Sequence, residues 1–420
     1  MKYIKKISSI VLALIMVLAM GTSVFAVQSD STTNSDKGIE TKEGKISIAK
    51  QMVFINAEDT TVREPNITYT YTISAVTPTS ATITDKNDIT GTVKKGVMEA
   101  ATNETATVAF ADTKTSAASA NGTSTASKYA DFQFDASKFP APGIYRYMVT
   151  ESTDVTKASV GITPTDNYSA DRYLDVYVQR NNGALEVYGY VLYDGDADQS
   201  IKSESATDGG DVSMKSAGYV NTATTSGTQA NVDVYKTQNL HIAKTTTGAL
   251  ADPEHDFPIT LAFTAASGVS ATPKVDVVLG GNGTLTGTAT DTLGSYITFA
   301  TSMTGTVRNE STIDLTGIPE GASVSLVETN NTPDSYKVKA KAGTADDSEE
   351  LLAEAIVAAG AASGSTTKQN LTGTVKIYIT NTLNAISPTN VIMRFAPYLF
   401  ILGGAMLLLV ASRRRKSDQE

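Results

Sequence analysis

The sequence predicts an all-β protein with two tandem β-sandwich domains between terminal segments of a different character. Several runs alternate apolar and polar residues with a period of two, and Gly, Pro and Asn separate them. Such runs occupy residues 46–50, 67–73, 131–135, 174–178 and 375–379. This alternation is typical of half-buried antiparallel strands. A long helical period is missing, and only residues 348–358 could form a short amphipathic helix.

The first 26 residues predict a secretory signal peptide. Three lysines lie within the first six residues, an apolar stretch follows over residues 10–20, and residues 24–26 read Val-Phe-Ala. The apolar run is short for a membrane span, and a small-x-small cleavage pattern follows it. A cleaved signal is therefore favoured over an uncleaved anchor, and residues 27–44 form a polar N-terminal leader.

The C-terminal end has three parts in a fixed order. Residues 386–390 read Ile-Ser-Pro-Thr-Asn, residues 391–411 are mainly apolar, and residues 412–420 contain a basic cluster. A basic cluster after an apolar segment halts export and keeps the tail in the cytoplasm. The order resembles the tripartite cell-wall sorting signal, which implies sortase and peptidoglycan as partners. By that resemblance the sortase cuts between Thr389 and Asn390. Asn390 stands where the usual signal has Gly, which leaves the sortase class open.

Composition excludes several classes of function. The chain carries 34 Lys+Arg against 44 Asp+Glu, a net charge of −10, which argues against a nucleic-acid partner. It has no Cys, so disulfides cannot stabilise it. Neither His241 nor His255 has a second candidate ligand at a useful spacing, so no metal site, triad or cofactor is expected. Residues 194–198 resemble the start of a calcium loop but lack its Gly and Glu, which favours a solvated turn.

The interior divides into two similar halves, residues 45–234 and 235–385, separated near the Thr/Ser/Gly-rich stretch 222–230. Each half opens with a strand that ends in Lys, continues through a Pro/Gly turn into a strand that ends in Glu, and closes on a strand that carries Asn. These residues are Lys50, Glu151 and Asn221 in the first half and Lys244, Glu328 and Asn381 in the second.

A Lys, a Glu and an Asn that meet in a core have a specific reactivity. Burial drives Lys toward its neutral, nucleophilic amine and Glu toward its protonated form. A neutral amine next to a polarised amide and a proton donor can form an intramolecular amide bond with loss of ammonia, and proximity supplies most of the acceleration. The structural alternative is that these are ordinary solvated residues at strand ends; the same order in both halves favours the cross-link.

The arrangement resembles the two-domain major pilins of the streptococcal T-antigen type, over nearly the whole chain from Lys45 to the basic tail. The resemblance implies immunoglobulin-like, CnaB-type domains, each stabilised by a Lys–Asn isopeptide bond. The implied bonds join Lys50 to Asn221 with assistance from Glu151, and Lys244 to Asn381 with assistance from Glu328.

Polymerisation of such pilins requires an exposed lysine that attacks the sortase acyl-enzyme of the next subunit. In similar pilins this lysine lies a few residues before the Asn of the first domain. Lys215 matches that place, and Lys236 is the alternative.

The expected function is that of a structural, non-enzymatic subunit of a covalent pilus on a Gram-positive surface. Its expected partners are sortase, other copies of itself, peptidoglycan, and accessory pilins or host surface ligands. The alternative is a monomeric or minor wall-anchored adhesin that binds a host or matrix ligand. A surface hydrolase is least favoured, because no acid pair or nucleophile motif stands out.

Overall fold

The computed structural model of the protein describes residues 33–384 and 401–408. Within the first range the description leaves out residues 35–37, 41–43, 57–60, 79–81, 85–89, 112, 115–122, 165–169, 194–200, 203–214, 217, 220, 225–226, 231, 300–301, 344–348, 370 and 372. The predicted signal peptide and the sorting pentapeptide, with Thr389 and Asn390, lie outside the described residues. Residues 401–408 are helical. Over the described part of the chain, no helix is long and apolar enough to cross a membrane.

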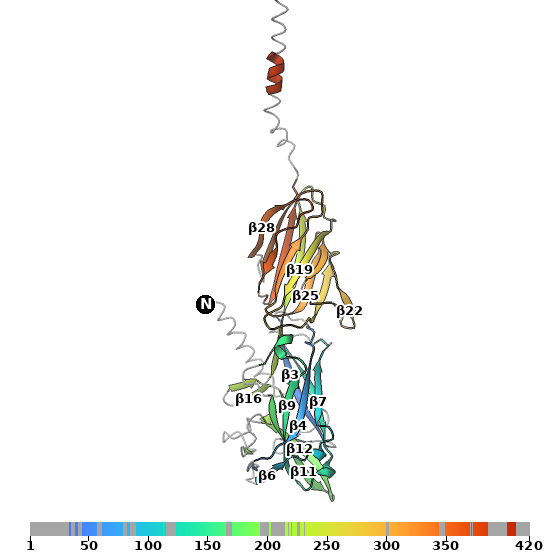
Figure 1. Cartoon of the computed structure of the whole chain (residues 1–420), viewed down its shortest axis with the longest axis vertical. Helices are drawn as coiled ribbons and strands as arrows, with labels where there is room; N and C mark the ends of the chain where they lie inside the picture. Colours follow the sequence, from blue (N-terminus) through green and yellow to red (C-terminus); the bar gives the residue numbers. More distant parts are fainter. Residues whose placement is uncertain are drawn as a thin grey trace, which may run out of the picture.

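The predicted all-β class is confirmed, because nearly all the described secondary structure is strand. The molecule is elongated, with two β domains stacked end to end along its long axis (Figure 1). Residues of many strands alternate between buried and more accessible positions, as in β4, where Ile67, Tyr69, Tyr71 and Ile73 are buried. This period-two pattern is what allows two sheets to pack face to face around one core.

The first domain has two layers of antiparallel and mixed strands. One layer contains β1 (Thr33–Asn34), β2 (Gly38–Glu40), β4 (Ile67–Ala75), β5 (Thr82–Thr84), β6 (Thr90–Lys95), β7 (Thr105–Phe110), β9 (Gly143–Thr153), β11 (Asp171–Asn181), β12 (Ala184–Tyr193), β13 (Ile201–Lys202) and β14 (Lys215–Ser216). The other contains β3 (Lys45–Ile55), β8 (Thr123–Gln133), β10 (Ile162–Pro164), β15 (Gly218–Tyr219) and the start of β18 (Asp233–Thr247). Short 3-10 helices η1 (Met98–Ala100), η2 (Ala136–Lys138) and η3 (Lys157–Val160) lie in the connections.

The second domain is a sandwich of two layers. One layer consists of eight neighbouring strands of a larger sheet, and the other is a separate five-stranded sheet. The first contains β20 (Lys274–Gly280), β22 (Ala289–Asp291), β23 (Gly294–Thr298), β25 (Thr312–Pro319), β27 (Tyr336–Gly343), β28 (Glu349–Val357), β30 (Thr374–Thr382) and the rest of β18. The five-stranded sheet contains β19 (Phe257–Thr264), β21 (Thr284–Leu285), β24 (Ser302–Val307), β26 (Ser323–Glu328) and β29 (Thr366–Lys368). Its core is mainly aliphatic, with Phe257, Phe263 and Tyr336 among the larger side chains.

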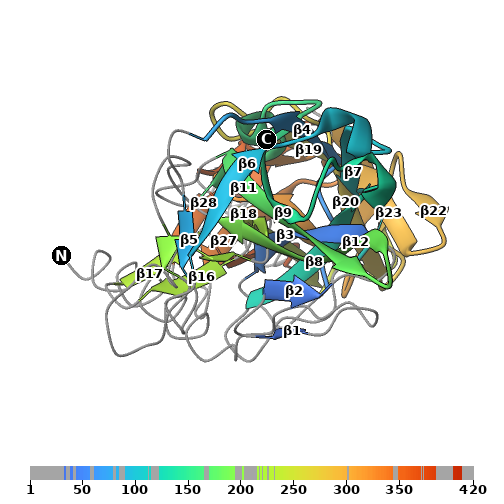
Figure 2. The same cartoon turned by 90° about the horizontal axis from the view of Figure 1, so that it is seen from below.

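One strand, β18, passes from the first domain into the second. Its first residues pair with β3, with Asp233 opposite Met52, and its later residues pair with β25 and β30. The first core includes Tyr235 and the second begins at Leu240. The domains are therefore joined by a continuous strand. The stretch around residues 222–230, which the sequence suggested as a linker, contains the paired strands β16 (Asn221–Thr224) and β17 (Gly227–Ala230), beside the first domain (Figures 1 and 2).

The helix suggested for residues 348–358 is wrong. Residues 349–357 form β28, which pairs antiparallel with β27 through a register that shifts twice. Helix-forming Glu, Leu and Ala residues dominate this segment, yet the exposed backbone of β27 offers it a ladder of hydrogen bonds. Tertiary pairing therefore overrides a modest helical preference.

Charged side chains hold the two domains together where they meet. The guanidinium of Arg63, in the first domain, lies 2.7 Å from Asp276 and 2.9 Å from Asp291 of the second. Lys114 of the first domain lies 2.8 Å from the other oxygen of Asp276. The Arg63 side chain is only 5% exposed, so the pair is screened less by salt than a surface pair. This joint favours a fixed orientation of the domains.

Candidate functional site

In the second domain, the structure brings all three predicted residues together. Lys244 lies on β18, Glu328 ends β26 and Asn381 lies on β30. The strands β18 and β30 are parallel neighbours, with Thr246 opposite Asn381, so Lys244 and Asn381 are two positions apart on the same face. Glu328 reaches them from the opposite sheet. The site therefore spans the sandwich.

The contacts within this site are short and buried. Lys244 Nζ lies 2.6 Å from Glu328 Oε2, and Asn381 Nδ2 donates to Glu328 Oε1 at 2.6 Å. The three residues are at most 1% exposed. Lys244 Nζ also sits 4.4 Å from the centre of the Phe257 ring. Burial lowers the pKa of Lys244 to about 8, although Glu328 opposes the shift. An ammonium group with this pKa loses its proton more easily than an exposed lysine.

One atom of the site lacks a hydrogen bond. Asn381 Oδ1 is buried and has no partner among the described residues. A buried carbonyl without a donor costs about 1–3 kcal/mol. When Glu328 takes the proton of Lys244, its carboxyl group becomes a donor and can polarise this amide carbonyl. The same proton transfer that activates the amine therefore activates its target.

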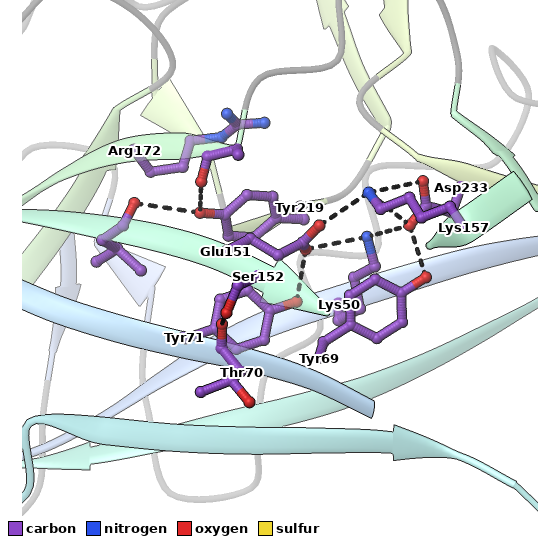
Figure 3. Close-up of polar contacts among 12 residues, drawn as sticks. Lys50, Tyr69, Thr70, Tyr71, Glu151, Ser152, Lys157, Arg172, Tyr219 and Asp233 are labelled. Atoms are coloured by element: carbon purple, nitrogen blue, oxygen red, sulfur yellow. Dashed lines mark hydrogen bonds and ion pairs between the residues drawn. The ribbon is translucent and has the colours of Figure 1, made fainter. Parts of the chain in front are cut away.

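In the first domain, Lys50 and Glu151 also meet as predicted, in a larger cluster (Figure 3). Lys50 lies on β3 and Glu151 on β9, and their Nζ and Oε2 atoms are 3.1 Å apart. A second carboxylate, that of Asp233 at the start of β18, lies closer, with Oδ2 2.7 Å from Lys50 Nζ. Lys157 of η3 completes the cluster, 2.9 Å from Glu151 Oε1 and 3.1 Å from Asp233.

The first site contains Asp233 as its third member, at the place where the sequence analysis expected Asn221. The side chain that contacts Lys50 from the closing strand is Asp233, which is fully buried. Asn221 begins β16, whose partner is β17. The chain runs beside Lys50 at Tyr219, leaves β3 through these two strands, and returns to it at Asp233.

Aromatic side chains enclose the first site. Tyr69 donates its hydroxyl to Asp233 Oδ2 at 2.7 Å, and Tyr71 donates to Glu151 Oε2 at 2.9 Å. The Tyr69 ring also lies under Lys50, with Nζ 4.3 Å from its centre. The two tyrosines are alternate residues of β4, so they share its inner face. This alternate spacing is the signal in the sequence that marks both positions as inward-facing.

Burial sets the protonation tendencies of the first cluster. It lowers the pKa of Lys50, although Glu151 and Asp233 oppose the shift. For Asp233, burial alone would raise the pKa, but the ammonium groups of Lys50 and Lys157 outweigh it, and the pKa is lowered. The two lysines and two carboxylates together are formally neutral, which is the state that a buried cluster favours.

The remaining predicted residues lie away from these clusters. Lys215 is on β14, opposite Tyr193 of β12. Lys236 has a side chain that is 47% exposed, 3.7 Å from Glu320. His241 contacts Asp314, and no group of three His, Cys, Asp or Glu residues in the described part of the chain could hold a metal ion.

Two family models match the chain. Residues 93–200 match FctA, the Spy0128-like isopeptide containing domain, and residues 238–382 match a domain of unknown function, DUF7601. A search of curated proteins found no match. The first match covers Glu151 and Lys157 of the first site, and the second covers all three residues of the second site.

Among solved structures, the chain is similar to three proteins of streptococcal pili. It is 16% identical to the major pilin from Streptococcus pyogenes, covering 82% of this chain and 100% of that one, with a TM-score of 0.37. It is 17% identical to the T3.2 major pilin of the same species, covering 81% and 98%, with a TM-score of 0.38. It is 17% identical to the pilus-presented adhesin Spy0125 (Cpa), covering 52% and 38%, with a TM-score of 0.26.

These TM-scores do not establish a common arrangement of whole chains. The match over residues 93–200 is independent of them. It confirms the resemblance to pilins with isopeptide domains that the sequence indicated, and it places this similarity in the first domain.

Proposed function

We propose that this protein is a structural subunit of a cell-surface pilus, stabilised by one intramolecular isopeptide bond in each domain. The observation that carries the proposal is the pair of buried clusters, each with a Lys, a Glu and an acyl donor on the strand that closes the domain. Burying charged groups costs free energy, and buried ion pairs by themselves contribute little to the stability of a fold. Two such clusters in one chain are therefore best explained by the covalent bonds they can form.

In the second domain, Lys244 Nζ attacks Cγ of Asn381. Glu328 accepts a proton from the ammonium group, which leaves a neutral amine. The new N–C bond forms, the amide C–N bond of Asn381 breaks, and the nitrogen leaves as ammonia with a proton relayed by Glu328. The second proton of the former ammonium group stays on Glu328 or departs as ammonium.

In the first domain, Lys50 Nζ attacks Cγ of Asp233. The N–C bond forms, one C–O bond of the carboxylate breaks, and the oxygen leaves as water with two protons from the Lys50 ammonium group. Glu151 relays a proton between the two groups and ends in the state in which it began. Tyr69, which donates to Asp233 Oδ2, stabilises the negative charge that develops on this oxygen.

The two bonds suit a protein that transmits tension. Each joins an early strand of its domain to the strand that closes it, since β3 pairs with β18 and β18 pairs with β30. A pulling force applied through the ends of a domain then passes through the cross-link instead of separating the sheets. A covalent amide, unlike a disulfide, also resists reduction.

We place the protein on a Gram-positive cell surface, exported by residues 1–26 and attached by a sortase. The sortase forms an acyl-enzyme at Thr389 and releases Asn390 and the following residues. The acyl group passes to a lysine of the next subunit in the shaft, or to peptidoglycan at the base. In this role the protein is a substrate of sortase and catalyses only its own cross-links.

Lys215 is expected to be the lysine that accepts the next subunit. Lys215→Arg keeps the charge but removes the nucleophile, so the ladder of covalent multimers in cell-wall extracts should collapse to a single band. Lys236→Arg is the matched control and should leave the ladder unchanged. The opposite pattern would assign the linkage to Lys236. A wild-type protein without any ladder would contradict the shaft role and favour a monomeric adhesin.

A further inference from the structure

The first cluster holds a residue that the bond-forming chemistry does not consume. Lys157 begins η3, outside the strands that carry the other members. Its Nζ donates to Glu151 Oε1 at 2.9 Å and to Asp233 Oδ1 at 3.1 Å (Figure 3). Its side chain is 18% exposed, compared with none for Lys50. Lys157 thus approaches both carboxylates from the solvent side.

Among the residues that the structure describes, the second cluster has no counterpart of Lys157. Among the ion pairs of the described residues, Glu328 pairs only with Lys244. Its acyl donor, Asn381, is neutral, so one ammonium group and one carboxylate balance there. In the first cluster the acyl donor is Asp233, which adds a negative charge. Lys157 adds the compensating positive charge.

We propose that Lys157 is the counter-charge that allows the first domain to use Asp233 where the second domain uses an asparagine. The inference rests on the proposed bond between Lys50 and Asp233. Its basis is the geometry: Lys157 contacts one oxygen of Glu151 and both oxygens of Asp233, while Lys50 contacts Oε2 and Oδ2.

The charge count explains why a second cation is required. Before the reaction, two ammonium groups face two carboxylates. Condensation removes the charges of Lys50 and Asp233 together, because an ammonium and a carboxylate become an amide and water. Lys157 and Glu151 remain as a buried pair, so the product is also neutral. Without Lys157, the product would leave the carboxylate of Glu151 buried alone, which is strongly unfavourable.

Lys157 also affects the nucleophile. A nearby ammonium group disfavours the charged form of Lys50, and this is one of the causes that lower its pKa. Two carboxylates without Lys157 would instead hold the proton on Lys50 more tightly. The backbone positions Lys157 firmly, because Ser270 and Ala271 of the second domain both donate to the carbonyl of Ser159 in η3 at 3.0 Å.

A charge-matching cycle tests the inference by intact mass spectrometry at short times after the start of expression. The variants are Lys157→Met, Lys157→Arg, Asp233→Asn and the double variant Lys157→Met/Asp233→Asn. Wild type and Lys157→Arg should lose one water in the first domain. Lys157→Met should do so more slowly, because Lys50 then holds its proton more tightly between two carboxylates.

In the variants that carry Asn at position 233, removing Lys157 should speed bond formation instead of slowing it. Asp233→Asn leaves Glu151 as the sole carboxylate for two ammonium groups, and its ion pair with Lys157 makes it a poorer proton acceptor for Lys50, so ammonia loss from the first domain should be slow. The double variant restores neutrality and should be faster than Asp233→Asn alone. A merely structural Lys157 would not be rescued by a second substitution. Loss of ammonia from the second domain, in the same molecules, reports that the second domain has folded, and the first calorimetric transition reports the same for the first domain.

Four results would overturn the inference. Equal rates for Lys157→Met and wild type would show that the charge is not needed. A double variant slower than Asp233→Asn would show that Lys157 supports the site in another way. A cross-link mapped to Lys157 by peptide sequencing would make it the nucleophile. If wild type itself retains the water, the proposed Lys50–Asp233 bond fails, and the inference fails with it.

Discussion

Glu328→Ala is expected to lower the melting temperature of the second domain by roughly 15 °C and to leave the first domain unchanged. The variant has no group to take the proton of Lys244, so the bond to Asn381 does not form. The cross-linked residues are 137 positions apart in the sequence. Closing a loop of that length stabilises a fold by about 5 kcal/mol in the chain-entropy description. The uncompensated Lys244 ammonium group adds to the loss.

Differential scanning calorimetry separates the effect from general damage, because the two domains supply two transitions. Glu320→Ala is the matched control: this carboxylate is 43% exposed and 3.7 Å from Lys236, so its removal should cost about 1 kcal/mol or less. A Glu328→Ala protein that melts as wild type and still lacks the mass of one ammonia would remove Glu328 from the reaction.

Lys50→Met is expected to destabilise the first domain by a similar amount. It removes the nucleophile of a bond between residues 183 positions apart, which corresponds to about 5 kcal/mol of loop-closure entropy. The methionine fills most of the volume beneath Tyr69, so the loss reflects the missing bond more than a cavity. The first transition should shift and the second should stay in place.

Lys45→Met is the control on the same strand. The Lys45 side chain is 41% exposed and pairs with Asp131 at 3.0 Å, so its replacement should change stability little. Denaturing gel electrophoresis gives an independent measurement, because a chain without its first cross-link is less compact when unfolded and should migrate more slowly. Unchanged migration and stability in Lys50→Met would exclude Lys50 as the bonded residue.

The second site could be predicted from sequence because its geometry follows from strands that run next to each other. Lys244 and Asn381 lie on adjacent parallel strands, and both interior-facing positions follow from the alternation of apolar residues around them. The Glu that ends β26 faces the same interior. The positions of these three residues therefore do not depend on the conformation of any loop.

The first site could be predicted only in part, because its closing strand is interrupted. Tyr219 pairs with Lys50, but the chain then forms β16 and β17 before β18 returns to β3. Alternation cannot reveal which segment of an interrupted strand brings its polar residue to the site. Lys157 was also out of reach, because it lies in a 3-10 turn whose position depends on contacts with the second domain.

The intact mass of the purified protein, residues 27–389, tests the central claim most directly. Two intramolecular bonds of the proposed kinds predict a mass below the sequence value by one water and one ammonia. Glu151→Ala should restore the water alone and Glu328→Ala the ammonia alone. A deficit of two ammonia molecules would contradict Asp233 as the acyl donor, and an unshifted mass would contradict isopeptide bonds in both domains.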